Sequence, residues 1–455
     1  MPPAAAKSGA PGPEPKAPLE KIAERAAPAL YRMTLPNGLV AVIDARPERR
    51  TVYCEIGVRV GSRDEPLALA GMSHLLEHLL FKEGETAGAP KNPAFSKIRA
   101  AGGDVNAETS FESTRYYCDV HADAFEEGWR GLSNLVRQTA FDAADVETER
   151  RVVLQEAALD KNNPVSVAGY SVLGRLFPDD PIGQPVIGFK KSLSRIQVED
   201  ATGYYRRYYT PDNAYALVVG GVDPLAAAAL VEETLGGWER GDPRPPLPAP
   251  PRPAPDRAFL FKTLTHQVYY GTGVLTDGEQ APERPAIDLL ARILGGGKSS
   301  RLVRRIVESE GLTEDFDVQT YSLSNIGVLA GGGAVDPAKA ERFKAILADE
   351  IARLAREPVD PSELDLAKGL LRADVVREFE SNEGIAGFRG HRLLYRQDVS
   401  RDAWAGEVER LGPEDLLAAA RKSLAPDKVR EVEIQPARGF GKVMAVLRYL
   451  LFRRI

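Results

Sequence analysis

The chain has 455 residues, of which 43% are hydrophobic and 27% are charged, and its formal net charge is −6. This length is too great for a single hydrophobic core, so we expect two or more domains. The composition is that of an ordinary globular protein. The chain has no excess of basic residues, so its charge gives no reason to expect a nucleic-acid partner. The two cysteines, Cys54 and Cys118, are too few for a disulfide framework or a four-cysteine zinc site.

The two ends differ in composition from the rest of the chain. Residues 1–29 are rich in Pro, Ala and Gly and predict a disordered leader. They contain no apolar stretch typical of a signal peptide, so the sequence as written favours the cytoplasm; a periplasmic location would require a signal that has been removed, and localisation stays open. Residues 437–455 are apolar and basic but too short to span a membrane. We expect them to dock on the body, on a partner or on a membrane surface.

Residues 30–240 are expected to form a first α+β domain. Its apolar runs are interrupted by turn signals such as Pro36-Asn37-Gly38, which favours a turn between strands. The patterns predict strands at 31–45, 51–62, 102–121 and 213–224, and helices at 71–84, 126–141 and 142–163.

Residues 241–257 are almost half proline, which no helix or central strand tolerates, and they predict a semi-rigid linker. After it, residues 258–436 repeat the order of strand, helix, strand hairpin and amphipathic helices. The sequence thus predicts an internal duplication of class α+β. Each of the two homologous halves should be a mainly antiparallel sheet with helices packed on one face.

Two histidines and a glutamate share the predicted helix 71–84, GMSHLLEHLLFKEG. With about 100° of rotation per residue, Glu77 lies about 60° to one side of His74 and His78 about 40° to the other, so the three share one face. Two imidazoles four residues apart can bind one zinc ion, and Glu77 could accept a proton from water. This spacing is the inverted zincin motif H-x-x-E-H. Two satisfied core histidines are the alternative if the motif stands alone.

A catalytic zinc site needs a third protein ligand. The helix predicted for 142–163 offers Glu147, Glu149, Glu156 and Asp160. Glu149 and Glu156 are seven residues apart and therefore lie on one face. The alternative is that these acids simply lie on the solvent-exposed face of the helix. This alternative fits Glu156 least well, because the surrounding VVLQEAAL is apolar.

The order of several motifs resembles a known family. The chain contains, in turn, GSRDEP, GMSHLLEHLLF, GGDVNAETSFESTRYY, ERRVVLQE, PIGQPVIG and YYTPDNAYALVVGGVD. In order and spacing it is similar to the pitrilysin-type zinc peptidases, and most closely to the bacterial proteins similar to the mitochondrial processing peptidase. The resemblance covers about residues 30–436 and is far more specific than the zinc motif alone.

The resemblance implies a zinc-dependent metalloendopeptidase that hydrolyses short or unfolded peptides inside a chamber, with one Zn²⁺ per chain. It also implies roles for individual residues: His74, His78 and Glu156 as zinc ligands, Glu77 as general base, Glu149 as an acid that orients a ligand, Phe81 in the pocket just past the scissile bond, and Asn106 and Ala107 on an edge strand to which the substrate adds.

The second half departs from the family pattern. Where members with a complete site carry an Arg and a Tyr seven residues apart, this chain has Val307 and Glu314. Neither side chain donates the hydrogen bonds that a developing oxyanion requires, and Arg305 with Tyr321 would be a donor pair out of register. We therefore expect the zinc-bearing subunit of a heterodimer, whose paralogous partner supplies the Arg/Tyr pair.

Two alternatives stay open beside the peptidase. One is a non-catalytic scaffold or core-like subunit of the same fold, which the retained zinc motif disfavours. The other is a peptide-binding module that keeps zinc only for structure. The expected partners are a peptide substrate and the paralogous subunit, and the apolar tail from Val443 to Ile455 is a candidate for the interface between subunits.

Overall fold

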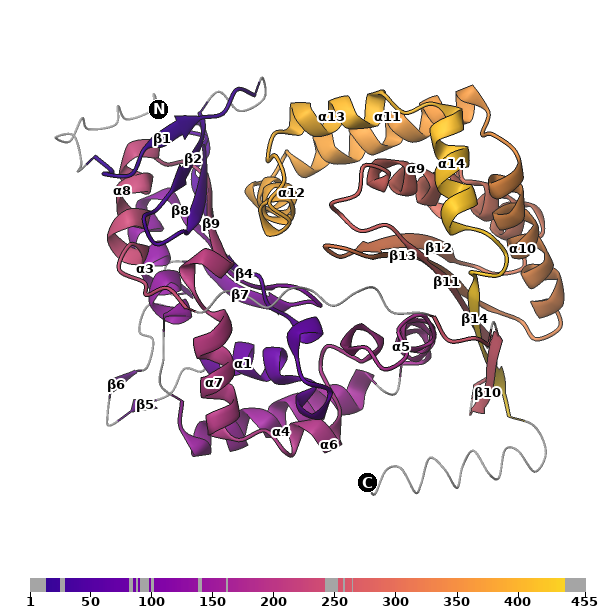
Figure 1. The fold of residues 1–455 in the computed structure, drawn as a ribbon, viewed down its shortest axis with the longest axis horizontal. Coiled ribbons are helices and arrows are strands. Elements are labelled where there is room, and N and C mark those ends of the chain that lie inside the picture. Colours follow the sequence, from indigo (N-terminus) through magenta and orange to yellow (C-terminus); the bar gives the residue numbers. More distant parts are fainter. Residues whose placement is uncertain are drawn as a thin grey trace.

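Two α+β halves follow one another along the chain (Figure 1). Of the predicted linker, only residues 241 and 253–256 are described, and of the predicted tail only residue 437. None of the helices in the described ranges combines the length and the apolar character that a membrane crossing requires. The computed structural model describes residues 14–24, 29–81, 85–86, 89–90, 98–99, 102–137, 141–160, 163–241, 253–256, 258–263 and 265–437.

The first half is built on a seven-stranded sheet of order β1-β2-β3-β9-β4-β8-β7. β3 and β9 are parallel, and the other neighbouring strands are antiparallel. A separate ribbon pairs β5 (Glu85–Thr86) with β6 (Ala89–Pro90). The strands of the sheet are β1 (Leu19–Lys21), β2 (Leu30–Thr34), β3 (Val40–Ala45), β4 (Thr51–Val58), β7 (Asp104–Thr109), β8 (Thr114–His121) and β9 (Ala214–Gly220).

The second half is built on a five-stranded sheet of order β10-β14-β11-β13-β12. Its strands are β10 (Ala258–Thr263), β11 (Val268–Thr276), β12 (Phe316–Ser322), β13 (Gly327–Val335) and β14 (Arg430–Pro436). The parallel pair is β10 with β14, and the other pairs are antiparallel. This order and these directions repeat those of β3-β9-β4-β8-β7, so the predicted α+β duplication is confirmed.

The helices follow the same duplicated plan. Those of the first half are α1 (Met72–Phe81), α3 (Phe125–Val136), α4 (Ala143–Asp160), α5 (Pro164–Leu176), α6 (Lys190–Leu193), α7 (Val198–Tyr208) and α8 (Pro224–Leu235). Those of the second half are α9 (Arg284–Gly295), α10 (Ala340–Arg356), α11 (Pro361–Glu378), α12 (Asn382–Leu394), α13 (Arg401–Glu409) and α14 (Pro413–Ser423). Short 3₁₀ turns occur at Ser62–Asp64, Leu67–Leu69, Ala122–Ala124, Pro181–Gly183 and Pro211–Asn213, and a π-helix at Val303–Ser309.

The first sheet is covered on both faces. Successive residues of a strand point to opposite faces, and β4 is buried along almost its whole length. Cys54 belongs to the same buried cluster as Trp129 of α3, whereas Tyr53 belongs to a cluster with Ile385 of α12. One face therefore packs against a helix of its own half and the other against a helix of the second half.

The sheet of the second half is likewise covered by a helix of the first half. α5 of the first half packs on β11 and β14, where Val172 shares a buried cluster with Val432 and Ile434. Gly271 and Gly273 of β11 permit this approach, because a Cβ at these positions would lie 2.8 Å and 2.7 Å from the Val172 methyl groups. The two halves are thus joined by exchanged helices, which the sequence pattern did not predict.

Part of the expected leader is structured. β1 pairs with β2, Ala17 is buried, and Glu24 bonds to Arg389 of α12. Arg389 is fully buried and lies 3.0 Å from Glu24 and 2.8 Å from Asp44 of β3, so a cation and two carboxylates satisfy one another. The prediction of a disordered leader is therefore wrong for residues 16–24, because overall composition hid a short strand and a buried acid.

Candidate metal centre

The helix α1 carries the histidines and is held by its apolar side. His74, Glu77 and His78 are each only partly buried and occupy the remaining face, as the helical period predicts. The buried apolar positions of the helix are Met72, Leu75, Leu76, Leu79 and Leu80.

The start of α1 is held by a buried glutamate. The Glu65 carboxyl group accepts hydrogen bonds of 2.6 Å from the backbone N–H groups of Gly71 and Ser73. Gly71 has a φ of +95°, and a Cβ there would lie 2.8 Å from the Ile187 carbonyl oxygen, so only glycine fits. Burial raises the pKa of Glu65 to about 8, although the two backbone bonds act in the opposite direction.

Near pH 7, Glu65→Gln should lower the free energy of unfolding by about 1–3 kcal/mol, because both oxygens of the carboxyl group can accept a hydrogen bond, whereas the NH₂ group of the amide cannot and leaves one buried N–H unpaired. A carboxyl pKa that is higher in the folded chain makes the wild type gain stability as the pH falls from about 8 toward 4.5, and the variant lacks this gain. Urea unfolding at both ends of this range measures the difference between the two proteins. A difference that is the same at both pH values, or equal to that of the exposed-site control Glu147→Gln, would contradict the expectation.

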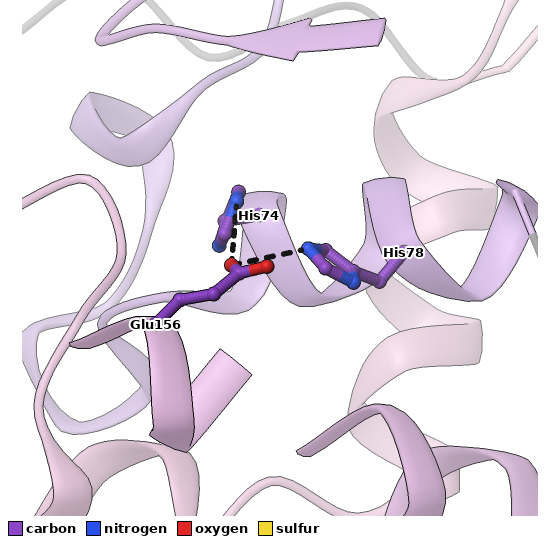
Figure 2. A group of neighbouring side chains, drawn as sticks. All are labelled: His74, His78 and Glu156. Atoms are coloured by element: carbon purple, nitrogen blue, oxygen red, sulfur yellow. Dashed lines mark ion pairs between the residues drawn. The ribbon is translucent and has the colours of Figure 1, made fainter. Parts of the chain in front are cut away.

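The structure brings His74, His78 and Glu156 together, although Glu156 comes from a different helix, α4 (Figure 2). Their potential ligand atoms all lie within 4.8 Å of one another, and no other such group occurs among the described residues. Glu156 Oε2 lies 3.9 Å from His74 Nε2 and 3.6 Å from His78 Nε2. Glu149 lies on the same helix, with its Oε2 3.6 Å from His78 Nδ1.

The chemistry of this cluster fits a zinc ion. The Nδ1 atom of His74 is buried and has no hydrogen-bond partner. Burial, and after it the neighbouring His78, lowers the pKa of His74 to about 4, so its imidazole is neutral near pH 7, as metal ligation requires. Two imidazoles with one carboxylate form a donor set that catalytic zinc sites use.

Glu77 lies beside the cluster and is oriented by a threonine. Its Oε2 accepts a hydrogen bond from the hydroxyl of Thr109, the last residue of β7. Burial raises the pKa of Glu77, while the bond from Thr109 and the charge of His78 oppose this. A raised carboxyl pKa suits a residue that must accept and release protons near neutral pH.

The expected substrate contacts lie on the same two elements. β7, which carries Asn106 and Ala107, is at the edge of the first sheet. Asn106 is exposed, whereas Ala107 packs partly against the first core. Phe81 ends α1 and stacks on the buried Tyr116, with ring centroids 6.3 Å apart. Glu77 and Thr109 join these two elements directly.

Sequence reasoning missed Thr109 and Glu65. For Thr109 a signal was present, because the period of two places Val105, Ala107 and Thr109 on the face of β7 that meets the first core. Glu65 stands in the quoted motif GSRDEP, but the backbone groups that it caps follow six and eight residues later.

The second half does not present obvious donors at the positions named from the sequence. Val307 packs against the second core, and Glu314 is exposed. Arg305 binds two acids of α10, and the Tyr321 hydroxyl donates to a neighbouring side chain of β12. The out-of-register pair is thus engaged elsewhere in this structure.

The duplicated α+β fold and the histidine cluster agree with a chain of the peptidase class, and two family profiles match it. The profile described as "Insulinase (Peptidase family M16)" matches residues 40–188, and the profile "Peptidase M16 inactive domain" matches residues 195–371. Together the two profiles match most of the chain, and relatives of 31% and 34% identity align over 88% and 89% of it, so the chain belongs to the M16 peptidase family.

Several relatives carry the name of zinc protease. A protein of Mycobacterium leprae named "uncharacterized zinc protease" is 34% identical over 409 residues, covering 89% of this chain and 91% of the relative. One of Mycobacterium tuberculosis is 31% identical over 404 residues, covering 88% and 92%. The zinc protease PqqE of Helicobacter pylori is 26% identical over 415 residues, covering 89% and 92%.

Two solved structures share the fold. A protease from Helicobacter pylori has a TM-score of 0.81 at 23% identity and covers 93% of this chain and 100% of its own. A Pseudomonas fluorescens structure titled as a peptidase M16 inactive domain has a TM-score of 0.82 at 20% identity and covers 90% and 99%. At these identities the likeness shows the fold alone.

Proposed function

We propose that this chain is a zinc-dependent metalloendopeptidase that hydrolyses short or unfolded peptides. The observation that carries the proposal is the convergence of His74, His78 and Glu156 close to Glu77, whose carboxyl group interacts electrostatically with His78 and Glu156. The names of the relatives support the same chemistry. The first three side chains would hold one Zn²⁺.

Each residue near the metal would then have a distinct task. Zinc, when bound, supplies a Lewis acid that polarises a peptide carbonyl and lowers the pKa of water. Glu77 accepts the proton of the attacking water at its carboxylate and delivers a proton to the leaving amine. Glu149 Oε2 lies 3.6 Å from His78 Nδ1, and as the facing carboxylate it would help to hold the orientation of that imidazole.

The substrate would bind as an added strand. Among the described strands β7 pairs with β8 alone, so its second edge would be available to pair with an extended peptide through main-chain hydrogen bonds. Asn106 and Ala107 lie on this strand, and Phe81 would contact the residue just past the scissile bond. Short or unfolded peptides suit such an edge, because a folded substrate has already paired its backbone groups.

The purified chain should contain about one zinc ion, and replacing one of the three ligand residues should abolish zinc binding. We expect His74→Ala, His78→Ala and Glu156→Gln to lose zinc, and Glu149→Gln to weaken binding by about 10- to 100-fold, the usual cost of losing an orienting partner. Elemental analysis gives the zinc content, and competition with a chelating dye gives the affinity.

The control is Glu147→Gln, which removes an exposed acid of α4 outside the cluster and should retain full zinc content. A wild-type chain that binds no zinc would favour the scaffold reading instead. Zinc that persists in Glu156→Gln would show that the third ligand has been assigned wrongly.

We further propose that the peptidase works as the zinc-bearing subunit of a heterodimer. Val307 and Glu314 provide no hydrogen-bond donor for a developing oxyanion, and Arg305 is already held by two acids. A paralogous subunit with an Arg/Tyr pair would complete the site across a chamber. The tail from Val443 to Ile455 lies outside the described residues, and contact with the partner or a membrane surface is our proposal for it.

A further inference from the structure

We propose that Thr109 is a positioning residue that holds the Glu77 carboxylate for proton transfer. The inference rests on the proposed peptidase function. Among the described residues, Thr109 is the one side chain that donates a hydrogen bond to Glu77. It donates to Oε2, and no hydrogen bond from a described residue to Oε1 is seen, so Oε1 is the oxygen that would take up a proton.

The threonine is well suited to hold a carboxylate still. Its β-branched side chain has few rotamers. Its backbone ends β7 and is paired across the sheet with Thr114, whose own hydroxyl donates to Val60 in the buried core. The hydroxyl of Thr109 is therefore held in place by the sheet. A donor that is already in place lowers the free energy needed to orient the Glu77 carboxylate during the reaction.

The position of Thr109 also links the base to the proposed substrate strand. Glu77 projects from α1, and Thr109 belongs to the strand that carries Asn106 and Ala107. A peptide added to the edge of β7 would thus be paired with the same strand that orients the base. Misplacement of the base by a small distance would reduce turnover without removing a contact to the peptide.

The duplicated half contains an informative counterpart. There, Thr320 of β12 donates a 2.9 Å hydrogen bond to Asp288 of α9. β12 and α9 occupy the places in the second half that β7 and α1 occupy in the first. Both halves thus have a threonine that joins the edge strand to a helix carboxylate, although the positions differ: the hairpin register places Ser322, not Thr320, opposite the turn as Thr109 is.

The two carboxylates differ in their other partners. Asp288 is also paired with Arg284 at 2.6 Å, and α9 contains no histidine. Glu77 has no such arginine or lysine partner among the described residues, and it lies beside the metal cluster. In the second half the hydrogen bond from threonine to carboxylate has a structural role. In the first half it holds a carboxylate that remains available to accept a proton.

Three variants of the full chain separate these roles. Thr109→Val removes the hydroxyl at nearly constant volume, Thr109→Ser retains it, and Thr320→Val removes the matched bond in the second half. We expect Thr109→Val to lower kcat on a quenched-fluorescence peptide by about 10- to 100-fold with KM unchanged. Thr109→Ser should restore most of the loss, and Thr320→Val should leave kcat at the wild-type value.

Zinc content and thermal unfolding provide readouts apart from activity. Thr109→Val should retain its zinc, and its melting temperature should fall no further than that of Thr320→Val. Crystal structures of the wild type and Thr109→Val decide the geometry without any assay, and we expect the Glu77 carboxylate to occupy one position in the wild type and to be displaced in the variant.

An unchanged kcat in Thr109→Val, an equal loss in Thr320→Val, or no rescue by serine would overturn the inference. So would a Glu77 carboxylate that keeps its position in the variant crystal. If the wild type cleaves no peptide under any condition, the proposed function fails, and the crystal structures still decide whether Thr109 positions Glu77.

Discussion

Glu77→Gln should lower kcat by about 10²- to 10⁴-fold, the usual contribution of a positioned general base, while the zinc content stays at the wild-type level. The amide has the shape of the carboxylate and can still accept the hydrogen bond from Thr109, but it cannot take a proton from water. Because Glu77 lies outside the group formed by His74, His78 and Glu156, its replacement should not disturb metal binding. Peptide cleavage and elemental analysis of the same preparation test both statements.

The combination of results identifies the role of Glu77. Lost activity with retained zinc is the signature of a base, whereas loss of both would indicate that Glu77 holds the metal. Retained activity in Glu77→Gln would reject the proposed mechanism. Glu147→Gln, again as the exposed acid on α4, should behave as the wild type in both measurements.

The local part of the site could be predicted from the sequence because it depends on one helix. The 100° rotation per residue alone places His74, Glu77 and His78 on one face, and the structure has them on the partly exposed side of α1. Glu156 is a harder case, because it comes from a helix about eighty residues later. The signal used was the apolar sequence around Glu156, but in the structure the Glu156 side chain is 43% exposed and Val152 and Leu159 are exposed as well, so the premise of a buried acid was wrong although the residue does join the cluster.

The rest depends on contacts between elements that a pattern does not specify. The apolar faces of α5 and α12 indicate that each helix is buried, but not that each covers the sheet of the opposite half. Glu24 likewise looks like one more acid of a polar leader until Arg389, more than three hundred residues away, is folded against it. The duplicated order of strands could be predicted, because it repeats along the chain.

Adding a paralogous partner that carries an Arg and a Tyr should raise the peptidase rate of this chain by at least an order of magnitude. Loss of one oxyanion donor typically costs about 2.7–4 kcal/mol, or about 100- to 1,000-fold in rate. The isolated chain should bind zinc and yet cleave slowly. Rates measured while the partner is titrated into a fixed amount of the chain test this proposal.

The isolated chain is expected to be slow because the side chains of its second half provide no donor for the oxyanion. The Val307 side chain packs against the second core, and Glu314 as a carboxylate would repel a negative oxygen rather than bind it. Arg305 binds Asp349 and Glu350, both of α10, so moving it toward a substrate would leave two acids without this partner. These observations support the proposal that the hydrogen-bond donor for the oxyanion comes from another subunit.

Two controls locate the missing donor. A partner in which the Arg and the Tyr are replaced by Gln and Phe should bind this chain without raising the rate. Arg305→Gln and Tyr321→Phe in this chain should leave the reconstituted rate unchanged, because both side chains are engaged elsewhere. If the isolated chain is instead fully active and either substitution slows it, the donor belongs to this chain, and its second half must move Arg305 or Tyr321 toward the zinc site during catalysis.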